Sequence, residues 1–208
     1  PSVLEVRGEA YLPLSAFRQM NEERADRGET VFANPRNATA GALRQLDSKV
    51  TASRPLAFFA YAVGHVEGFE ARTQKEVLGQ LELWGFQFNP NWAHHSSLDS
   101  VVEYCHRWQE LRNTLDYEID GVVVKVDRLD YQEQLGAVSK DPRWAIAFKF
   151  PGQTAATRLL EIKVNVGHTG ALNPYAVLEP VHVGGVTIRT ATLHNEDDIA
   201  RKDIREGD

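Results

Sequence analysis

The sequence predicts an α+β fold of antiparallel strands and helices over residues 1–151, followed by a small, incomplete β-barrel over residues 152–208. Three observations lead to this prediction. Two stretches, 118–126 and 142–151, alternate their side chains with the period of two that strands require. Cap residues followed by apolar residues at helical spacing mark several helices before them. After residue 151 come short alternating strands with glycine turns, which are typical of a barrel.

The chain opens with a predicted strand over residues 3–12, which Pro13 ends because proline cannot donate to a strand ladder. Ser15 is the predicted cap of a scaffold helix that Gly28 ends. Within the strand, Glu9 could accept hydrogen bonds from ribose hydroxyls at the mouth of a nucleotide site. The alternative is an ordinary exposed charge on a strand.

The dipeptide Asn34-Pro35 predicts the start of a helix, with a cap residue followed by proline at the first helical position. Arg36 and Arg44 are eight residues apart and therefore project from roughly the same side of that helix. Two guanidinium groups on one face suit two phosphates of a DNA strand or of a cofactor pyrophosphate. On spacing alone, a pair of surface arginines is the better explanation.

The next predicted strand, 58–64, places the aromatic side chain of Tyr61 on an apolar face, where a core position is the alternative to a binding role. Thr73-Gln-Lys-Glu76 is a capping-box pattern that opens a helix. A longer helix begins after Ser97 or Asp99. Both helices are expected to be scaffold.

The two central strands each place a lysine on a face of small residues. In the first, Gly121, Val123 and Lys125 face away from Val122, Val124 and Val126. In the second, Arg143, Ala145, Ala147 and Lys149 face away from Trp144, Ile146, Phe148 and Phe150. Small side chains leave room for a flat group and two ammonium groups suit an anion, which is the combination that a nucleotide pocket needs. The alternative is an amphipathic hairpin with two solvated lysines.

Composition sets further limits. The formal net charge is −6, so contact with DNA is expected to depend on local arginine clusters. One cysteine, Cys105, excludes an internal disulfide and a four-cysteine zinc site. The adjacent His94 and His95 would face opposite ways in a strand, and no metal site is expected. No apolar run approaches the roughly 20 residues that cross a membrane, so a soluble, intracellular protein is expected.

Several longer motifs resemble the bacterial NAD-dependent DNA ligases, in that family's order. Asp120-Gly-Val-Val-Val-Lys125 and Trp144-Ala-Ile-Ala-Phe-Lys-Phe-Pro151 are similar to its last two nucleotide-binding motifs. Three further stretches carry the resemblance across the chain, and they are Glu5-Val-Arg-Gly-Glu9, Phe32 to Asp47 with Asn-Pro-Arg-Asn in it, and Ala191-Thr-Leu-His-Asn195. The resemblance implies the latter part of a nucleotidyltransferase (adenylation) domain over 1–151 and the start of an OB-fold over 152–208.

The resemblance also implies roles for residues that contact the nucleotide. Glu9 would contact the sugar and Tyr61 would stack on adenine. Lys125 would lie at the adenine edge or near it, and Lys149 would steady the AMP phosphate. The family forms AMP from NAD on a lysine, passes it to the 5′-phosphate of a nick, and releases it when the 3′-hydroxyl attacks. NAD or AMP and nicked double-stranded DNA are therefore the expected partners.

For the transfer steps the resemblance implies four further residues. Asp120 would help to hold magnesium or orient the nucleophile, since magnesium needs only one carboxylate when the substrate supplies phosphates. Arg36 and Arg44 would act in nick sealing, and Arg112 matches a family arginine implicated in activity. The resemblance adds zinc only for the full-length protein, and it implies a cytoplasmic, nucleoid-associated bacterial monomer.

The nucleophilic lysine of the family lies in a Lys-x-Asp-Gly motif, whereas the Asp-Gly of this chain is preceded at the matching position by Glu118. That motif stands upstream of the position of Glu9 in the family, so it is expected before Pro1, in a longer protein of which this chain is a piece. Two alternatives stay open. One is a non-catalytic nucleotide- or DNA-binding module on the same scaffold, and the other is an ATP-dependent ligase or capping enzyme, from which the Asn-Pro-Arg-Asn motif points away.

Overall fold

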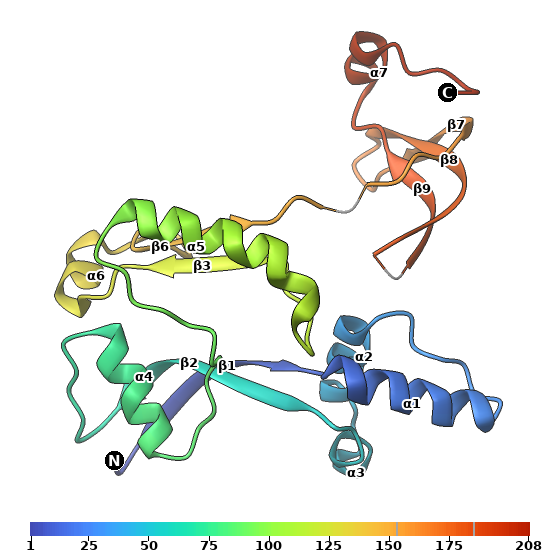
Figure 1. The fold of residues 1–208 in the computed structure, drawn as a ribbon. Coiled ribbons are helices and arrows are strands. Elements are labelled where there is room, and N and C mark those ends of the chain that lie inside the picture. Colours follow the sequence, from blue (N-terminus) through green and yellow to red (C-terminus); the bar gives the residue numbers. More distant parts are fainter. Residues whose placement is uncertain (153, 185) are drawn as a thin grey trace. The chain divides into compact units, whose positions relative to one another are not determined.

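The computed structural model describes residues 1–152, 154–184 and 186–208, and Figure 1 traces the chain from end to end. Its residues gather into two compact units, Pro1–Phe150 and Pro151–Asp208. Both units combine helices with antiparallel strands, so the predicted α+β class is confirmed. Within the described ranges, none of the helices has the length and apolar character needed to cross a lipid bilayer.

The first sheet pairs β1 (Leu4–Tyr11) with β2 (Ala57–Val66) in antiparallel register, close to where strands were predicted. Helix α4 (Gln74–Leu83) packs against β2, as Figure 1 shows. The contact is apolar, and its buried members are Ala60, Val77, Leu78 and Leu81. This cluster fixes the helix on the sheet because buried apolar area is the main source of stability.

Helix α1 (Leu14–Asp26) corrects one prediction, because Ser15 is not its cap. Pro13 occupies the cap position and makes no side-chain cap hydrogen bond. Ser15 instead lies in the first turn, where its backbone N–H and its hydroxyl both donate to the carboxylate of Asp116. The capping group is thus supplied by a distant segment, which the local sequence could not reveal. The predicted end of the helix is close, since Gly28 follows with a positive φ of 69°.

Helix α2 (Pro35–Leu43) begins as predicted, with the Asn34 side chain accepting a hydrogen bond from the Asn37 backbone N–H at 2.8 Å. The short helix α3 (Ser48–Ala52) follows it. A second core cluster joins the end of β1 to α1 and α2, and its buried members are Leu12, Met20 and Ala38. This cluster holds the segment that carries Arg36 against the end of the first sheet.

The two predicted helix caps further along the chain are also confirmed. The Thr73 hydroxyl caps α4 by accepting from the Glu76 backbone N–H. Ser97, rather than Asp99, caps α5 (Leu98–Leu111). The one-turn helix η1 (Arg112–Thr114) follows α5 directly.

The second sheet of this unit pairs β3 (Gly121–Lys125) with β6 (Ala145–Lys149) in antiparallel register. The connector between them contains helix α6 (Leu129–Leu135) and the two-residue strands β4 (Ala137–Val138) and β5 (Asp141–Pro142), which were not predicted from the sequence. Helix α6 has no side-chain cap, but the buried Gln132 amide donates to the Val126 carbonyl at 2.6 Å. The Leu129 backbone N–H, the first of the helix, donates to the distant Arg72 carbonyl at 2.9 Å. A tertiary contact therefore supports a helix that has no local start signal.

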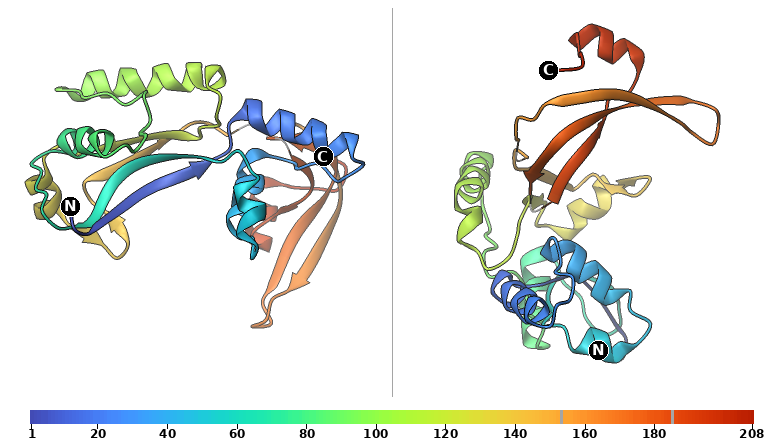
Figure 2. Two further views of the ribbon diagram at one scale, coloured as in Figure 1. Left: turned by 90° about the horizontal axis from the view of Figure 1, so that it is seen from below. Right: turned by 90° about the vertical axis from the view of Figure 1, so that its right-hand side faces the viewer.

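The second unit contains one sheet in the order β7 (Leu159–Val166), β8 (Leu172–Val183) and β9 (Val186–Thr192), followed by helix α7 (Glu196–Lys202). Figure 2 shows these strands as a curved, open sheet, in agreement with the predicted incomplete β-barrel. One of the predicted glycine turns, Gly184-Gly185, falls between β8 and β9, and Gly185 lies outside the described residues.

Candidate functional site

Lys125 and Lys149 lie on the same face of the β3–β6 pair. Gly121 is opposite Lys149 and Lys125 is opposite Ala145, and residues that face each other across a ladder point to the same side. The other face meets α5, which contacts β3 and brings the His106 ring to 5.5 Å from the Phe148 ring. The lysines therefore stand on the face that α5 leaves uncovered. The face is open, since Val123 at its centre is 59% exposed.

At one end of this face, Asp120 joins two cations. The Lys149 Nζ donates to one carboxylate oxygen at 3.1 Å, and the Arg36 guanidinium donates to the other at 3.4 Å. The hydrogen bond from Lys149 is the main reason why the pKa of Asp120 is lowered, and the charges of Lys149 and Arg36 act in the same direction. The carboxylate is thus ionised at neutral pH and bridges α2 to the strand pair.

All three side chains of this cluster are accessible to solvent. Their exposed fractions are 60% for Asp120, 65% for Lys149 and 75% for Arg36. Ion pairs this exposed contribute only about 0–1 kcal/mol to stability. An incoming phosphate could therefore replace the carboxylate as the partner of the two cations at little cost.

At the other end of the face, Lys125 contacts Tyr61 on β2. Its Nζ lies 4.9 Å from the centre of the Tyr61 ring and donates to the Tyr61 carbonyl at 3.5 Å. Burial lowers the pKa of Lys125. Tyr61 is not a core residue, since it is 46% exposed. The alternative interpretation of this aromatic residue as core is therefore wrong.

A bulge in the first sheet frees the Tyr61 carbonyl for this contact. Gly8 pairs with Ala60 and Arg7 with Ala62, so the ladder passes over Tyr61. The Gln74 side-chain amide donates to the same carbonyl oxygen at 2.9 Å. Gln74 was not identified from the sequence, because only the fold brings the first residue of α4 to this strand.

The remaining predicted site residues lie apart from these two clusters or have other surroundings. Glu9 is exposed on β1 opposite Phe59. Arg44 is exposed directly after the last residue of α2. Among the residues that the structure describes, neither the Glu9 carboxylate nor the Arg44 guanidinium has a hydrogen-bond or ion-pair partner. Arg112 is half-buried at the start of η1.

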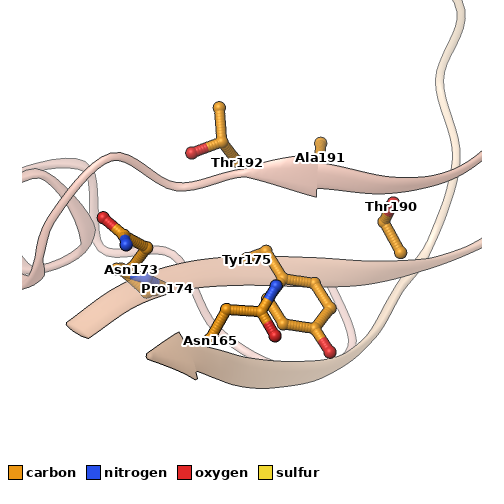
Figure 3. A pocket seen from close by; sticks show the side chains of 7 residues that line it. All are labelled: Asn165, Asn173, Pro174, Tyr175, Thr190, Ala191 and Thr192. Atoms are coloured by element: carbon orange, nitrogen blue, oxygen red, sulfur yellow. The ribbon is translucent and has the colours of Figure 1, made fainter. Parts of the chain in front are cut away.

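Two hollows occur elsewhere in the molecule, and neither is lined by a predicted site residue. One, of about 420 Å³, lies on the second unit, where Figure 3 shows polar side chains from three adjacent strands, namely Asn165, Asn173, Tyr175, Thr190 and Thr192. The other, also about 420 Å³, lies beside β2, and its lining includes three phenylalanines, namely Phe59, Phe86 and Phe88. No group of three or more potential metal ligands gathers among the described residues.

Comparison with known proteins gives a consistent family assignment. Residues 1–153 match the model of the NAD-dependent DNA ligase adenylation domain, and residues 156–208 match the model of the NAD-dependent DNA ligase OB-fold domain. The chain is 55% identical over 208 residues to a DNA ligase of Herpetosiphon aurantiacus, covering 100% of this chain and 31% of that protein.

Two further relatives agree. A DNA ligase of Roseiflexus sp. is 53% identical over 208 residues, covering 100% of this chain and 29% of the relative. A DNA ligase of Carboxydothermus hydrogenoformans is 54% identical over 206 residues, covering 99% of this chain and 31% of the relative. The chain thus spans about a third of the length of these proteins. The resemblance inferred from the motifs is confirmed, and the chain belongs to the NAD-dependent DNA ligase family.

Proposed function

We propose that this chain acts as part of an NAD-dependent DNA ligase that joins a 5′-phosphate to a 3′-hydroxyl at a nick in duplex DNA. The intermediates would be an enzyme–AMP and a DNA–adenylate. The observation that carries the proposal is the pair of family-motif lysines, Lys125 and Lys149, on one open face of small residues. On this basis 1–151 serves as the nucleotide-handling part and 152–208 as the OB-fold part of a bacterial enzyme that acts as a monomer in the cytoplasm, at the nucleoid.

The two ends of the lysine face would bind different parts of adenylate. Lys125 and Tyr61 already form a cation–π pair, so the aromatic ring and the small side chains next to it offer a surface on which adenine could stack. Lys149 would bind the phosphate, because its ammonium group is exposed and, among the described residues, pairs with the Asp120 carboxylate, which phosphate can replace. Glu9, exposed on β1, would accept from the ribose hydroxyls.

Asp120 is the residue that would hold magnesium. Its carboxylate is ionised and accessible, and one carboxylate is enough when the substrate supplies phosphate oxygens. When bound, the ion would neutralise developing charge on the phosphate. Release of Lys149 and Arg36 from Asp120 would leave both cations free to contact the same phosphate. Arg44 and Arg112 would act with Arg36 on the DNA strand during sealing.

One observation favours a second function. The Lys-x-Asp-Gly motif of the family does not occur in residues 1–208, whose one Asp-Gly, Asp120-Gly121, belongs to a later motif, so a non-catalytic nucleotide- or DNA-binding module is the second candidate. A chimera separates the two. Residues 1–208 would replace the matching segment of the Herpetosiphon aurantiacus ligase, to which they are 55% identical.

The chimera is expected to seal a nicked duplex with NAD and not with ATP. Lys149→Met in the chimera is expected to abolish sealing, whereas Lys163→Met, which removes a lysine that pairs with Glu161 in the second unit, is expected to retain it. A folded chimera that binds AMP and nicked DNA but seals nothing would favour the binding module.

A further inference from the structure

The strands that carry the two halves of the lysine site belong to separate sheets. β1 pairs with β2 and β3 pairs with β6, and in the described part of the chain no ladder joins the two pairs. Tyr61 stands on the first sheet and Lys125 on the second, yet the Lys125 Nζ lies 4.9 Å from the Tyr61 ring. Other contacts must therefore set the spacing between the sheets.

The segment before β3 is attached to the start of helix α1, which follows β1. The Leu14 backbone N–H donates to the Asp116 carbonyl at 2.7 Å, and the Ser15 N–H donates to the Asp116 carboxylate at 2.8 Å. The Ser15 hydroxyl donates to the second carboxylate oxygen at 2.5 Å. These hydrogen bonds from Ser15 lower the pKa of Asp116, so the carboxylate is ionised at neutral pH.

The segment after β3 is attached in the same way to the start of helix α4, which packs on β2. The Gln74 N–H donates to the Asp127 carbonyl at 2.7 Å, and the Lys75 N–H donates to the Asp127 carboxylate at 3.0 Å. The Leu129 N–H also donates to the Arg72 carbonyl at 2.9 Å. Gln74, the first residue of α4, is the residue whose side chain contacts the Tyr61 carbonyl.

The two attachments use the same atoms. In each, the first helical N–H donates to the carbonyl of one aspartate and the second donates to its carboxylate. The first N–H groups of a helix have no partner inside the helix, and they are normally satisfied by a residue next to it in sequence. Here the acceptor is 101 residues away for Ser15 and 52 residues away for Lys75. Each aspartate therefore caps a helix that belongs to the first sheet and at the same time ties one end of β3 to it.

We propose that Asp116 and Asp127 are positioning residues that fasten β3 at both ends to the helices of the first sheet and so hold Lys125 against Tyr61. The proposal rests on the proposed function insofar as the fastened face binds adenylate. Neither aspartate touches the nucleotide in this scheme. They act through Lys125 and Gln74, which they hold beside the Tyr61 carbonyl.

Nuclear magnetic resonance of the 208-residue chain tests the positioning directly. The Tyr61 ring should shift the ε-methylene protons of Lys125 upfield of those of the other lysines, and Tyr61→Leu should remove that shift. In the double variant Asp116→Ala, Asp127→Ala, the resonance should move to the position of a free lysine, and each single variant should move it part of the way. Asp127→Asn keeps an acceptor oxygen and should restore most of the shift.

Thr73→Ala is the matched control. It removes a cap from the start of α4, but that cap is local, since within the described residues the Thr73 hydroxyl accepts from Glu76 of the same helix. The backbone bridge between Thr73 and Arg128 is kept in this variant. It should weaken the helix and leave the Lys125 resonance in place. The proposal is overturned if the wild-type chain shows no upfield shift, if the folded single alanine variants keep it unchanged, or if Thr73→Ala abolishes it equally.

Titration with AMP separates this proposal from the proposed function. If both hold, the alanine variants should bind AMP about tenfold more weakly, the order expected from loss of one charge-assisted contact, and Thr73→Ala should bind normally. The wild-type chain could bind no AMP while the Lys125 resonance still depends on both aspartates. In that case the positioning role of Asp116 and Asp127 is supported and the proposed binding of a nucleotide on this face is wrong.

Discussion

The Asp120 carboxylate and the Lys149 ammonium form a direct hydrogen bond of 3.1 Å across the end of the β3–β6 pair. The antiparallel register explains this contact. Gly121 lies opposite Lys149, so the residue before Gly121 stands next to the lysine. The Phe150 backbone N–H, which follows Lys149, donates to the Asp120 carbonyl at 2.9 Å and closes the pair. The contact ties together the two motifs that carry the family resemblance.

This contact predicts a pH dependence. The pKa of Asp120 should lie below the value of about 3.9 of an unperturbed aspartate, because Lys149 and Arg36 favour its charged form. A carboxyl group whose pKa is lowered by folding stabilises the protein above its unfolded pKa, and this contribution is lost as the pH falls through the folded pKa. Carbon-detected titration of the carboxyl group measures the shift.

Two variants distinguish the causes of this shift. Lys149→Met should raise the pKa of Asp120 more than Arg36→Met does, since the Lys149 hydrogen bond is the largest cause. Lys163→Met, at a lysine paired with Glu161, serves as the control and should leave the titration unchanged. Equal effects of all three variants would show that the shift reflects only the total charge of the chain.

Gly121→Ala should disturb the site through the backbone. A Cβ at this position would lie 2.5 Å from the Phe148 carbonyl oxygen and 3.1 Å from the Lys149 Cα, so β3 and β6 would have to move apart. We expect a loss of about 1–3 kcal/mol in the free energy of unfolding and weaker binding of AMP, measured by denaturant unfolding and calorimetry.

Gly79→Ala is the matched control for this substitution. Gly79 lies inside α4, and among the described residues no neighbouring atom lies within 4 Å of its added Cβ. Alanine is the better helix former, so this variant should gain about 0.5–1 kcal/mol. If Gly121→Ala proved as stable as wild type, the close approach of the two strands would be wrong.

Local patterns predicted the parts of this site that depend on one segment alone. The period of two placed Lys125 and Lys149 on small-residue faces, and the register of β3 with β6 puts both on the same side. Asn34 before Pro35 marked the start of α2 because this cap is made within four residues. The alternation of side chains along a strand and a cap within one helical turn both depend only on the local backbone, which a short stretch of sequence specifies.

Contacts between distant segments could not be predicted in this way. Arg36 and Asp120 are 84 residues apart, and Ser15 and Asp116 are 101 apart. Serine is a residue type that often caps helices, but Ser15 lies inside the first turn of α1. There its hydroxyl donates to the carboxylate of Asp116, a charged acceptor. Helix α6 was missed for the same reason, since its first backbone N–H, from Leu129, donates to the carbonyl of the distant Arg72.

The core under the first sheet predicts a large loss of stability from a substitution at one leucine of α4 and a small loss at another. Leu81 is 0% exposed and packs with Ala60 and Val77, so Leu81→Ala should cost about 2–5 kcal/mol. Leu83, on the same helix, is 79% exposed, and Leu83→Ala should change stability by no more than about 0.5 kcal/mol. Urea unfolding of both variants measures the difference. Similar losses would place the core elsewhere.

Asn34→Ala should weaken both stability and the site. The Asn34 side chain caps the helix whose second residue is Arg36, and its loss should cost about 0.5–2 kcal/mol. Without the cap the first turn of the helix should fray, and Arg36 lies in that turn. The effect of Arg36 on the pKa of Asp120 should therefore also diminish. Asn34→Asp retains the acceptor and should keep both properties, as judged by unfolding and by the same carboxyl titration. If Asn34→Ala lowered the stability but left the titration of Asp120 unchanged, the cap would not be what positions Arg36 at the site.

The last prediction concerns covalent chemistry. Transfer of AMP from NAD to the enzyme needs a lysine amine that attacks the α-phosphate, and in the family this lysine precedes Asp-Gly by two residues, where this chain has Glu118. Lys125 and Lys149 are arranged to bind rather than attack, since one contacts a tyrosine ring and the other an aspartate. The intact mass of the 208-residue chain should therefore be unchanged after incubation with NAD and magnesium.

Glu118→Lys tests the position alone and should also remain unmodified, because the resemblance places Asp120-Gly121 in a later motif than the one that carries the nucleophile. A stable gain of one AMP by the unchanged chain, mapped to either lysine, would contradict the division of roles proposed for this face.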